Sequence, residues 1–141
     1  MEEILALGLL ADLNDLAESL YNIKLDELFL ESPENPNLFE LELICGNVNE
    51  TVIYINNRIN FSNINTETFE RSLVYYLKIL YSSINIEIFS KLSYKLWLRL
   101  PSYISEKSPF FVLNYADDYI SISFTDSARQ SYEKLFTYYN V

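Results

Sequence analysis

The sequence contains no histidine, a single cysteine, only two glycines and four prolines. Without histidine there can be no Ser-His-Asp or Cys-His nucleophile pair and no zinc site with a histidine ligand. The lone Cys45 cannot form an internal disulfide, and it fits a reducing compartment. No apolar run approaches the roughly 20 residues that a membrane-spanning helix needs. The sequence therefore predicts a protein with no membrane span, no catalytic group of these kinds, no cofactor and no metal.

The chain has 141 residues, of which 50% are hydrophobic and 16% aromatic. This length suits one domain, because chains usually divide only beyond about 250 residues. We therefore expect a single domain over residues 1–141. The first residues, Met1-Glu2-Glu3, are acidic, whereas a secretory signal begins with a basic region. No secretory signal is predicted, and we expect a cytoplasmic protein.

Charge is distributed unevenly along the chain. Residues 1–50 hold twelve acidic residues and one basic residue, Lys24, whereas residues 51–141 hold eight acidic and nine basic residues. Nearly all of the net charge of −10 therefore lies in the first third. Direct nucleic-acid binding is disfavoured, because phosphates need a cationic footprint. The asymmetry favours a basic partner steered by the field, although an acidic surface can also serve solubility alone.

Three segments have the apolar periodicity of amphipathic helices, and they cover about residues 2–21, 66–83 and 126–140. In the first, Asp12, Asp15 and Glu18 fall opposite the apolar arc, with no basic residue four positions away to neutralise them. Residues 23–31 are ambiguous between a short helix and an extended segment. Residues 32–37 contain two prolines and two asparagines and predict a break.

Five other segments have the alternation or the β-branched and aromatic content of strands: residues 38–45, 51–57, 86–100, 110–115 and 119–124. The last two are predicted to form a hairpin that turns at Asp117-Asp118. The resulting order is α-β-β-α-β-β-β-α. It predicts an α+β fold in which an antiparallel sheet of about five strands packs with three helices.

Several polar groups are candidate sites. Glu40 and Glu42 would share one face of the strand over 38–45, about 7 Å apart, and suit a solvated sheet face better than acid–base chemistry. The Asp117-Asp118 pair lacks the spacing of a calcium loop. A stripe of cations spaced by four, Lys91, Lys95 and Arg99, faces one way in a strand or a helix. It could touch nucleic acid or an acidic partner, or simply balance the acidic third of the chain.

The whole profile resembles the immunity proteins of bacterial contact-dependent growth inhibition and related polymorphic toxin systems. The features that carry the resemblance are the acidic helix face, the acidic segment Phe39-Glu40-Leu41-Glu42-Leu43, the Asp117-Asp118 turn and the absence of histidine. Members of that class are small, cytoplasmic and often acidic. They bind a toxin domain, frequently a nuclease, and block it. The resemblance implies a protein-binding inhibitor without catalysis.

We therefore expect a protein partner, namely a basic toxin domain, and a chain that is a monomer or a weak homodimer. The residues predicted to bind that partner are Asp12, Asp15, Glu18, Glu40, Glu42, Asp117, Asp118 and the neighbouring aromatic residue Tyr119. Two alternatives stay open from the sequence. One is a phage inhibitor or an adaptor protein, and the other is a small-molecule-binding protein or enzyme with an α+β cone.

Overall fold

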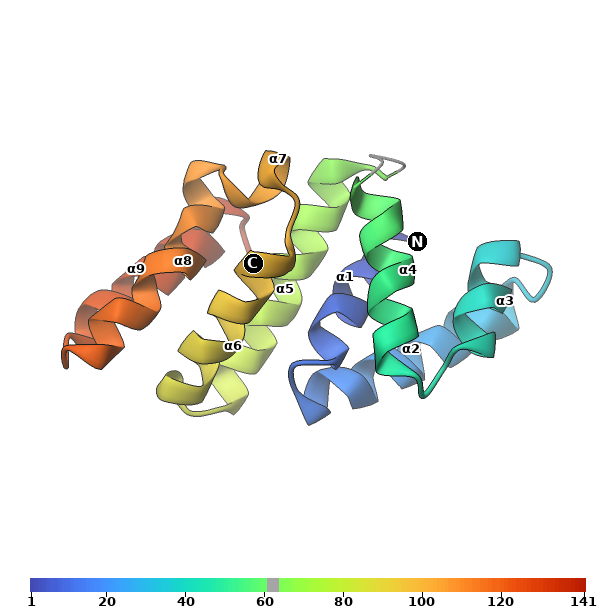
Figure 1. The fold of residues 1–141 in the computed structure, drawn as a ribbon, viewed down its shortest axis with the longest axis horizontal. Coiled ribbons are helices and arrows are strands. Elements are labelled where there is room, and N and C mark those ends of the chain that lie inside the picture. The colour runs from blue at the N-terminus through green and yellow to red at the C-terminus, as the bar shows by residue number, and fades with distance from the viewer. Residues whose placement is uncertain (61–63) are drawn as a thin grey trace. The chain divides into compact units, whose positions relative to one another are not determined.

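The computed structural model describes residues 1–60 and 64–141, and every regular element in these ranges is a helix (Figure 1). The contacts within the chain group into two compact units, Met1–Phe69 and Glu70–Val141. We call them the N-terminal unit and the C-terminal unit, and the boundary falls within helix α5 (Thr66–Ser83). That the chain forms one domain stays a prediction of the sequence.

The N-terminal unit is built on α1 (Glu2–Ala11), which packs against α2 (Asp15–Glu31) and α4 (Val48–Asn60). A short helix, α3 (Pro36–Leu43), packs against α2. Every residue of α1 from Ile4 to Ala11 is buried. A helix that is apolar on all sides belongs in a core rather than at a surface.

A change of direction divides the predicted helix over 2–21 into α1 and α2. The side-chain oxygen of Asn14 accepts hydrogen bonds from the backbone N–H groups of Leu16, at 2.8 Å, and Ala17, at 3.4 Å. This is the N-cap geometry that starts a new helix. The new helix runs on to Glu31, so the ambiguous residues 23–31 are helical.

The C-terminal unit contains most of α5 (Thr66–Ser83), then α6 (Ile86–Arg99), α7 (Ser102–Ser105), α8 (Ser108–Ser121) and α9 (Thr125–Tyr138). Rings from three helices meet in its core: Tyr81 of α5, Phe89 of α6 and both Tyr132 and Phe136 of α9. Their centroids lie between 4.9 and 6.0 Å apart in mostly edge-to-face pairs. Such pairs are the favoured geometry for buried aromatic side chains.

The predicted helices over 66–83 and 126–140 are confirmed as α5 and α9. The predicted sheet is wrong. Residues 38–45 lie largely in α3, 51–57 in α4, 86–100 in α6, and 110–115 in α8, while 119–124 form the end of α8 and the turn after it. The α+β assignment is replaced by an all-helical arrangement of the described residues.

The segment 86–100 shows why the alternation of apolar and polar residues led to a wrong prediction of a strand. Reading it as a strand placed Ile88 and Leu98 on the buried face, yet they are 59% and 60% exposed. The side chains that α6 buries include Phe89, Leu92 and Leu96, at helical spacings of three and four. Two small buried serines, Ser90 and Ser93, complete that face. Because serine is polar, the apolar residues alone do not reveal the helical spacing.

Local backbone features account for the corrections at α3 and at the predicted Asp117-Asp118 turn. Asn35 accepts hydrogen bonds from the backbone N–H groups of Asn37 and Leu38, and Pro36 occupies the first turn of α3. Proline is well suited to that position, because its missing N–H needs no partner there. The Asp117-Asp118 pair lies inside α8 and makes no turn. The turn follows at Ser123, whose φ of 66° is left-handed.

Over the described residues, none of the helices has both the length and the apolar character needed to cross a membrane.

Candidate functional site

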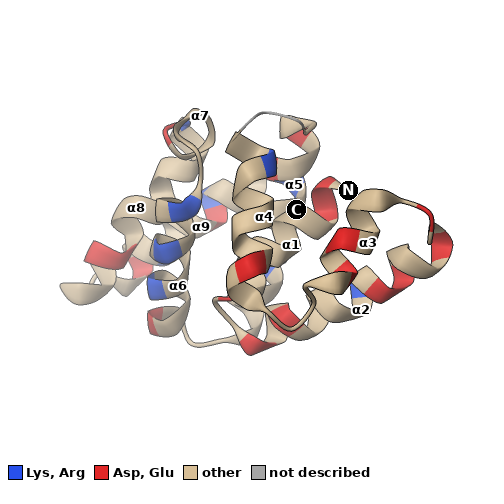
Figure 2. Ribbon diagram, turned by 45° about the vertical axis from the view of Figure 1, so that its right-hand side comes forward, with Lys and Arg blue, Asp and Glu red and all other residues tan. Residues whose placement is uncertain are grey.

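The N-terminal unit carries all of the net negative charge of the protein. Residues 1–69 contain thirteen acidic residues and two basic residues, whereas residues 70–141 contain seven acidic and eight basic residues. Acidic residues recur along α2 and α3 (Figure 2). The N-terminal unit is therefore strongly negative, and the C-terminal unit is close to neutral.

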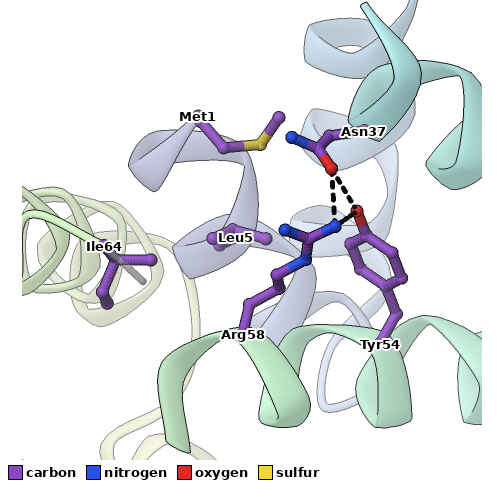
Figure 3. Close-up of a pocket in the computed structure, with 6 residues that line it drawn as sticks. All are labelled: Met1, Leu5, Asn37, Tyr54, Arg58 and Ile64. Carbon is purple, nitrogen blue, oxygen red and sulfur yellow. Dashed lines mark hydrogen bonds between the residues drawn. The ribbon is translucent and has the colours of Figure 1, made fainter. Parts of the chain in front are cut away.

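Both basic residues of the N-terminal unit are engaged with neighbours. Lys24 lies 3.6 Å from the carboxylate of Glu3. Arg58 donates from Nη2 to the side-chain oxygen of Asn37, at 2.6 Å, and to the hydroxyl of Tyr54, at 2.9 Å (Figure 3). The Arg58 guanidinium also lies over the Tyr54 ring, 5.0 Å from its centroid. Among the described residues, no cation lies within ion-pair distance of a carboxylate on α2 or α3.

The pocket around Arg58 is small, at about 50 Å³, and is lined by Met1, Leu5, Asn37, Tyr54, Arg58 and Ile64 (Figure 3). Partial desolvation raises the pKa of Tyr54, and the Arg58 charge opposes that rise. The phenol therefore stays protonated and holds Arg58 through a hydrogen bond. This arrangement joins α3 to α4.

Two carboxyl groups meet where α2 lies against α3. Partial desolvation, together with a hydrogen bond and repulsion from Asp26, raises the pKa of Glu42. The thiol of Cys45 lies beside them and donates to the side-chain oxygen of Asn22 at 3.6 Å. Desolvation and the carboxylates of Glu42, Asp26 and Glu18 raise the pKa of Cys45, so the thiol is a poor nucleophile at neutral pH.

Exposed apolar side chains flank these carboxyl groups. On α2, Ile23 and Leu30 lie three residues before and four residues after Asp26, and Leu30 is 79% exposed. On α3, Phe39 lies three residues before Glu42, and Leu43 is 69% exposed. We define the acidic α2–α3 surface by the residues that form it: Glu18, Ile23, Asp26, Leu30, Phe39, Glu42 and Leu43.

The predicted binding residues of the N-terminal unit only partly come together. Glu18 and Glu42 belong to the acidic α2–α3 surface. Asp12 follows the last residue of α1, and Asp15 opens α2. Glu40 lies near the hydroxyl of Tyr54, on a different side of α3 from Glu42. The expectation that Glu40 and Glu42 share a face is therefore wrong. In a helix, residues that are two positions apart in sequence point in directions about 200° apart.

The other predicted binding residues belong to α8 in the C-terminal unit. Asp117 accepts a hydrogen bond from the hydroxyl of Ser90 at 2.8 Å, which ties α8 to α6. Asp118 is exposed. Tyr119 makes an edge-to-face contact with Tyr115, with ring centroids 5.8 Å apart. These three residues belong to the C-terminal unit, whereas the carboxyl groups on α2 and α3 belong to the N-terminal unit.

Sequence reasoning missed Asp26, Ile23 and Leu30, because the pattern of residues 23–31 did not decide between a helix and an extended segment. A usable signal was present. Leu16, Ile23 and Leu30 recur every seven residues, which places them on one face of a helix. Asn14 before Asp15 is also a good cap residue.

The described residues contain no group of three or more cysteine or acidic side chains arranged to hold a metal ion. No protein-family model, curated protein or solved structure matches the chain.

Proposed function

We propose that the protein is a non-catalytic inhibitor that binds a basic protein domain through the acidic α2–α3 surface. The observation that carries this proposal is the Asp26–Glu42 pair. Asp26 lies close enough to Glu42 to help raise the pKa of the Glu42 carboxyl group, and the two basic residues of the same unit are engaged with other neighbours. An arginine or lysine of a partner placed between them would relieve their repulsion.

The surrounding apolar side chains supply what charge alone cannot. Complementary charge chiefly accelerates association, while tight binding depends on a few well-packed anchors. Phe39, Leu43, Ile23 and Leu30 are exposed next to the carboxyl groups and are suited to that role. An inhibitor with nanomolar affinity needs about −12 kcal/mol, so both contributions are required.

The partner that best fits the resemblance to immunity proteins is a toxin domain, and the setting would be the cytoplasm. A nuclease domain carries a cationic cleft for phosphates, and a carboxylate-rich surface can occupy such a cleft. A phage inhibitor or an adaptor would use the same surface on a different target. The α+β cone alternative has lost its basis, since the described residues form no sheet.

The decisive experiment measures binding kinetics on a partner that copurifies with the full-length protein. We expect the Asp26→Asn/Glu42→Gln variant to associate about tenfold more slowly at about 0.05 M salt, with a smaller difference at about 0.5 M. The Phe39→Ala variant should instead dissociate faster. The matched control is Asp126→Asn/Glu133→Gln, which removes the same charge from exposed positions on α9.

Inhibition is tested on the same partner by titrating its toxic or enzymatic activity with the wild-type protein. Equal association rates for the acidic-surface variant and the α9 control would overturn the proposed surface. A partner that binds but keeps its full activity would support an adaptor and overturn the inhibitor.

A further inference from the structure

A row of contacting aromatic rings runs along α6 and α8 in the C-terminal unit. Tyr94 stacks on Trp97, with centroids 6.4 Å apart, and Trp97 meets Phe111 edge-to-face at 5.9 Å. Phe111 contacts Tyr115 at 6.1 Å, and Tyr115 contacts Tyr119 at 5.8 Å. We call these five residues the aromatic strip. All five side chains are at least partly accessible to solvent.

Cations border the strip on its α6 side. Lys91 and Lys95 are exposed, and neither has a carboxylate within ion-pair distance among the residues that the structure describes. Lys91 lies three residues before Tyr94, and Lys95 lies next to it. On the α8 side, Asp118 adds one exposed negative charge near Tyr119. The surface is therefore apolar and aromatic with a basic edge, a composition typical of protein interfaces.

The outward face of α2 has the complementary composition. Leu16, Ile23 and Leu30 are exposed and lie on one line along the helix. Exposed carboxylates border this line, namely Asp26, Glu27 and Glu31. We call these six residues the α2 stripe. It is the exposed face of an acidic amphipathic helix.

We propose that the aromatic strip of one copy of this chain binds the α2 stripe of a second copy. At about 1.5 Å per residue, the α8 part of the strip spans roughly 12 Å from Phe111 to Tyr119, and the α2 stripe spans roughly 21 Å from Leu16 to Leu30. The strip is therefore long enough to cover the half of the stripe from Ile23 to Leu30, which spans roughly 10 Å. The charges agree as well, because Lys91 and Lys95 would face Asp26 and Glu27. Since the two surfaces differ, the contact is head-to-tail rather than self-symmetric.

Single-stranded nucleic acid fits the strip less well. Bases stack on open ring faces beside a positive groove. Here the rings cover one another's faces and edges, and the N-terminal unit has a net charge of −11 from its thirteen acidic and two basic residues. An occupant that carries carboxylates on an apolar helix is therefore favoured over one that carries phosphates.

Self-association would also regulate the acidic α2–α3 surface, because Ile23, Asp26 and Leu30 belong to both surfaces. A basic partner and a second copy could not bind α2 at the same time. Binding of the partner would therefore dissociate the self-associated chains. The head-to-tail contact does not depend on the proposed function. It can be tested on the purified protein alone.

The test is the molar mass in solution, measured by sedimentation equilibrium from about 5 to 500 μM, the range in which a weak interface assembles. We expect the mean mass of the wild-type chain to rise with concentration and to fall back at about 0.5 M salt. Lys91→Glu/Lys95→Glu destroys the basic edge, and Ile23→Glu/Leu30→Glu destroys the apolar stripe. Each variant alone should stay monomeric.

Mixing the two variants provides the sharpest result. Each retains one intact surface, so an equimolar mixture should form a 1:1 complex and grow no further. Lys134→Glu/Arg129→Glu on α9 is the matched control, and it should self-associate like the wild-type chain. A wild-type chain that stays monomeric throughout, a mixture that does not assemble, or tighter binding of oligo-dT than of a second copy would overturn the proposal.

Discussion

The hydroxyl of Tyr139 donates a hydrogen bond to Oε2 of Glu70 across 3.0 Å, joining the residue after α9 to α5. Glu70 is buried, and its other oxygen accepts from the ammonium of Lys107. A buried carboxylate is tolerated when donors satisfy both of its oxygens. Burial, and then the charge of Glu70, raise the pKa of Tyr139. Glu70 thus connects three segments that are distant in sequence: α5, Lys107 before α8, and Tyr139 after α9.

Replacing Tyr139 with Phe removes only this donor, because the ring still packs against Phe110 at 5.6 Å between centroids. Hydrogen bonds to charged groups contribute about 1.5–3 kcal/mol, so we expect the free energy of unfolding to fall by about 2 kcal/mol. The free energy of unfolding is measured by urea denaturation at pH 7. The control is Tyr138→Phe, which changes an exposed neighbour and should shift the value by less than about 0.5 kcal/mol. Equal losses in both variants would show that the bond to Glu70 contributes nothing.

Stability should also fall in alkaline solution. Burial raises the pKa of Tyr132 to about 12 and raises the pKa values of Tyr21 and Tyr139 as well. In the unfolded chain these phenols ionise near pH 10, while in the folded protein they stay neutral. Above pH 10 the unfolded state therefore binds fewer protons, and the free energy of unfolding decreases as pH rises.

Denaturation between pH 8 and about pH 11.5 tests this dependence. The decline should be shallower in Tyr139→Phe, which has one fewer titrating phenol. A wild-type curve that stays flat through pH 11 would show that the buried tyrosines ionise as freely as they do in the unfolded chain.

The sequence predicted α5 and α9 because their apolar residues follow helical spacing and polar residues occupy the opposite face. It did not predict α6, where buried serines replace apolar residues and exposed Ile88 and Leu98 imitate a strand. Isoleucine favours strands only weakly, and packing overrides that preference. The scarcity of glycine was the better signal, because five strands joined by tight turns would need residues that tolerate left-handed backbone.

The acidic character of the proposed binding surface was predictable, but the residues at its centre were not. Glu18 and Glu42 could be named from charge alone. Asp26 could not be paired with Glu42, because that contact depends on how α3 returns against α2 after the loop at residues 32–35. Such a return is set by tertiary packing, which a local pattern does not encode.

Gly8 lies where α1 approaches α2 and α4 closely. A Cβ at this position would overlap Cδ1 of Ile55 and lie 3.1 Å from the ring of Tyr21. Gly8→Ala gains about 1 kcal/mol of helix propensity but overpacks a core in which Ile55 is fully buried, a cost of about 1–3 kcal/mol. We expect a net loss of stability of about 1 kcal/mol, measured by urea denaturation.

A second variant, Ile55→Val, removes the methyl group that a Cβ at position 8 would overlap. Alone, it should lower the free energy of unfolding by about 1 kcal/mol. In the double variant, the methyl group introduced by Gly8→Ala fills that space, so the double variant should be more stable than the sum of the two losses predicts. Strict additivity would mean that Gly8 and Ile55 do not share a tight contact.

Glu42 should show opposing effects on stability and on binding. Because its pKa is raised in the folded protein, the ionised carboxylate is less favourable there than in the unfolded chain, and this penalty exists at pH 7 but vanishes in acid. Glu42→Gln should therefore raise the melting temperature at pH 7 by about 1–3 °C and leave it unchanged near pH 3.

Glu34→Gln is the matched control, because it removes the same charge from an exposed loop position between α2 and α3. If both variants gain equally at pH 7, the benefit comes from lower net charge rather than from the Asp26 contact. A gain specific to Glu42→Gln, together with slower association with a basic partner, would show that the carboxyl pair weakens the free protein and is retained for binding.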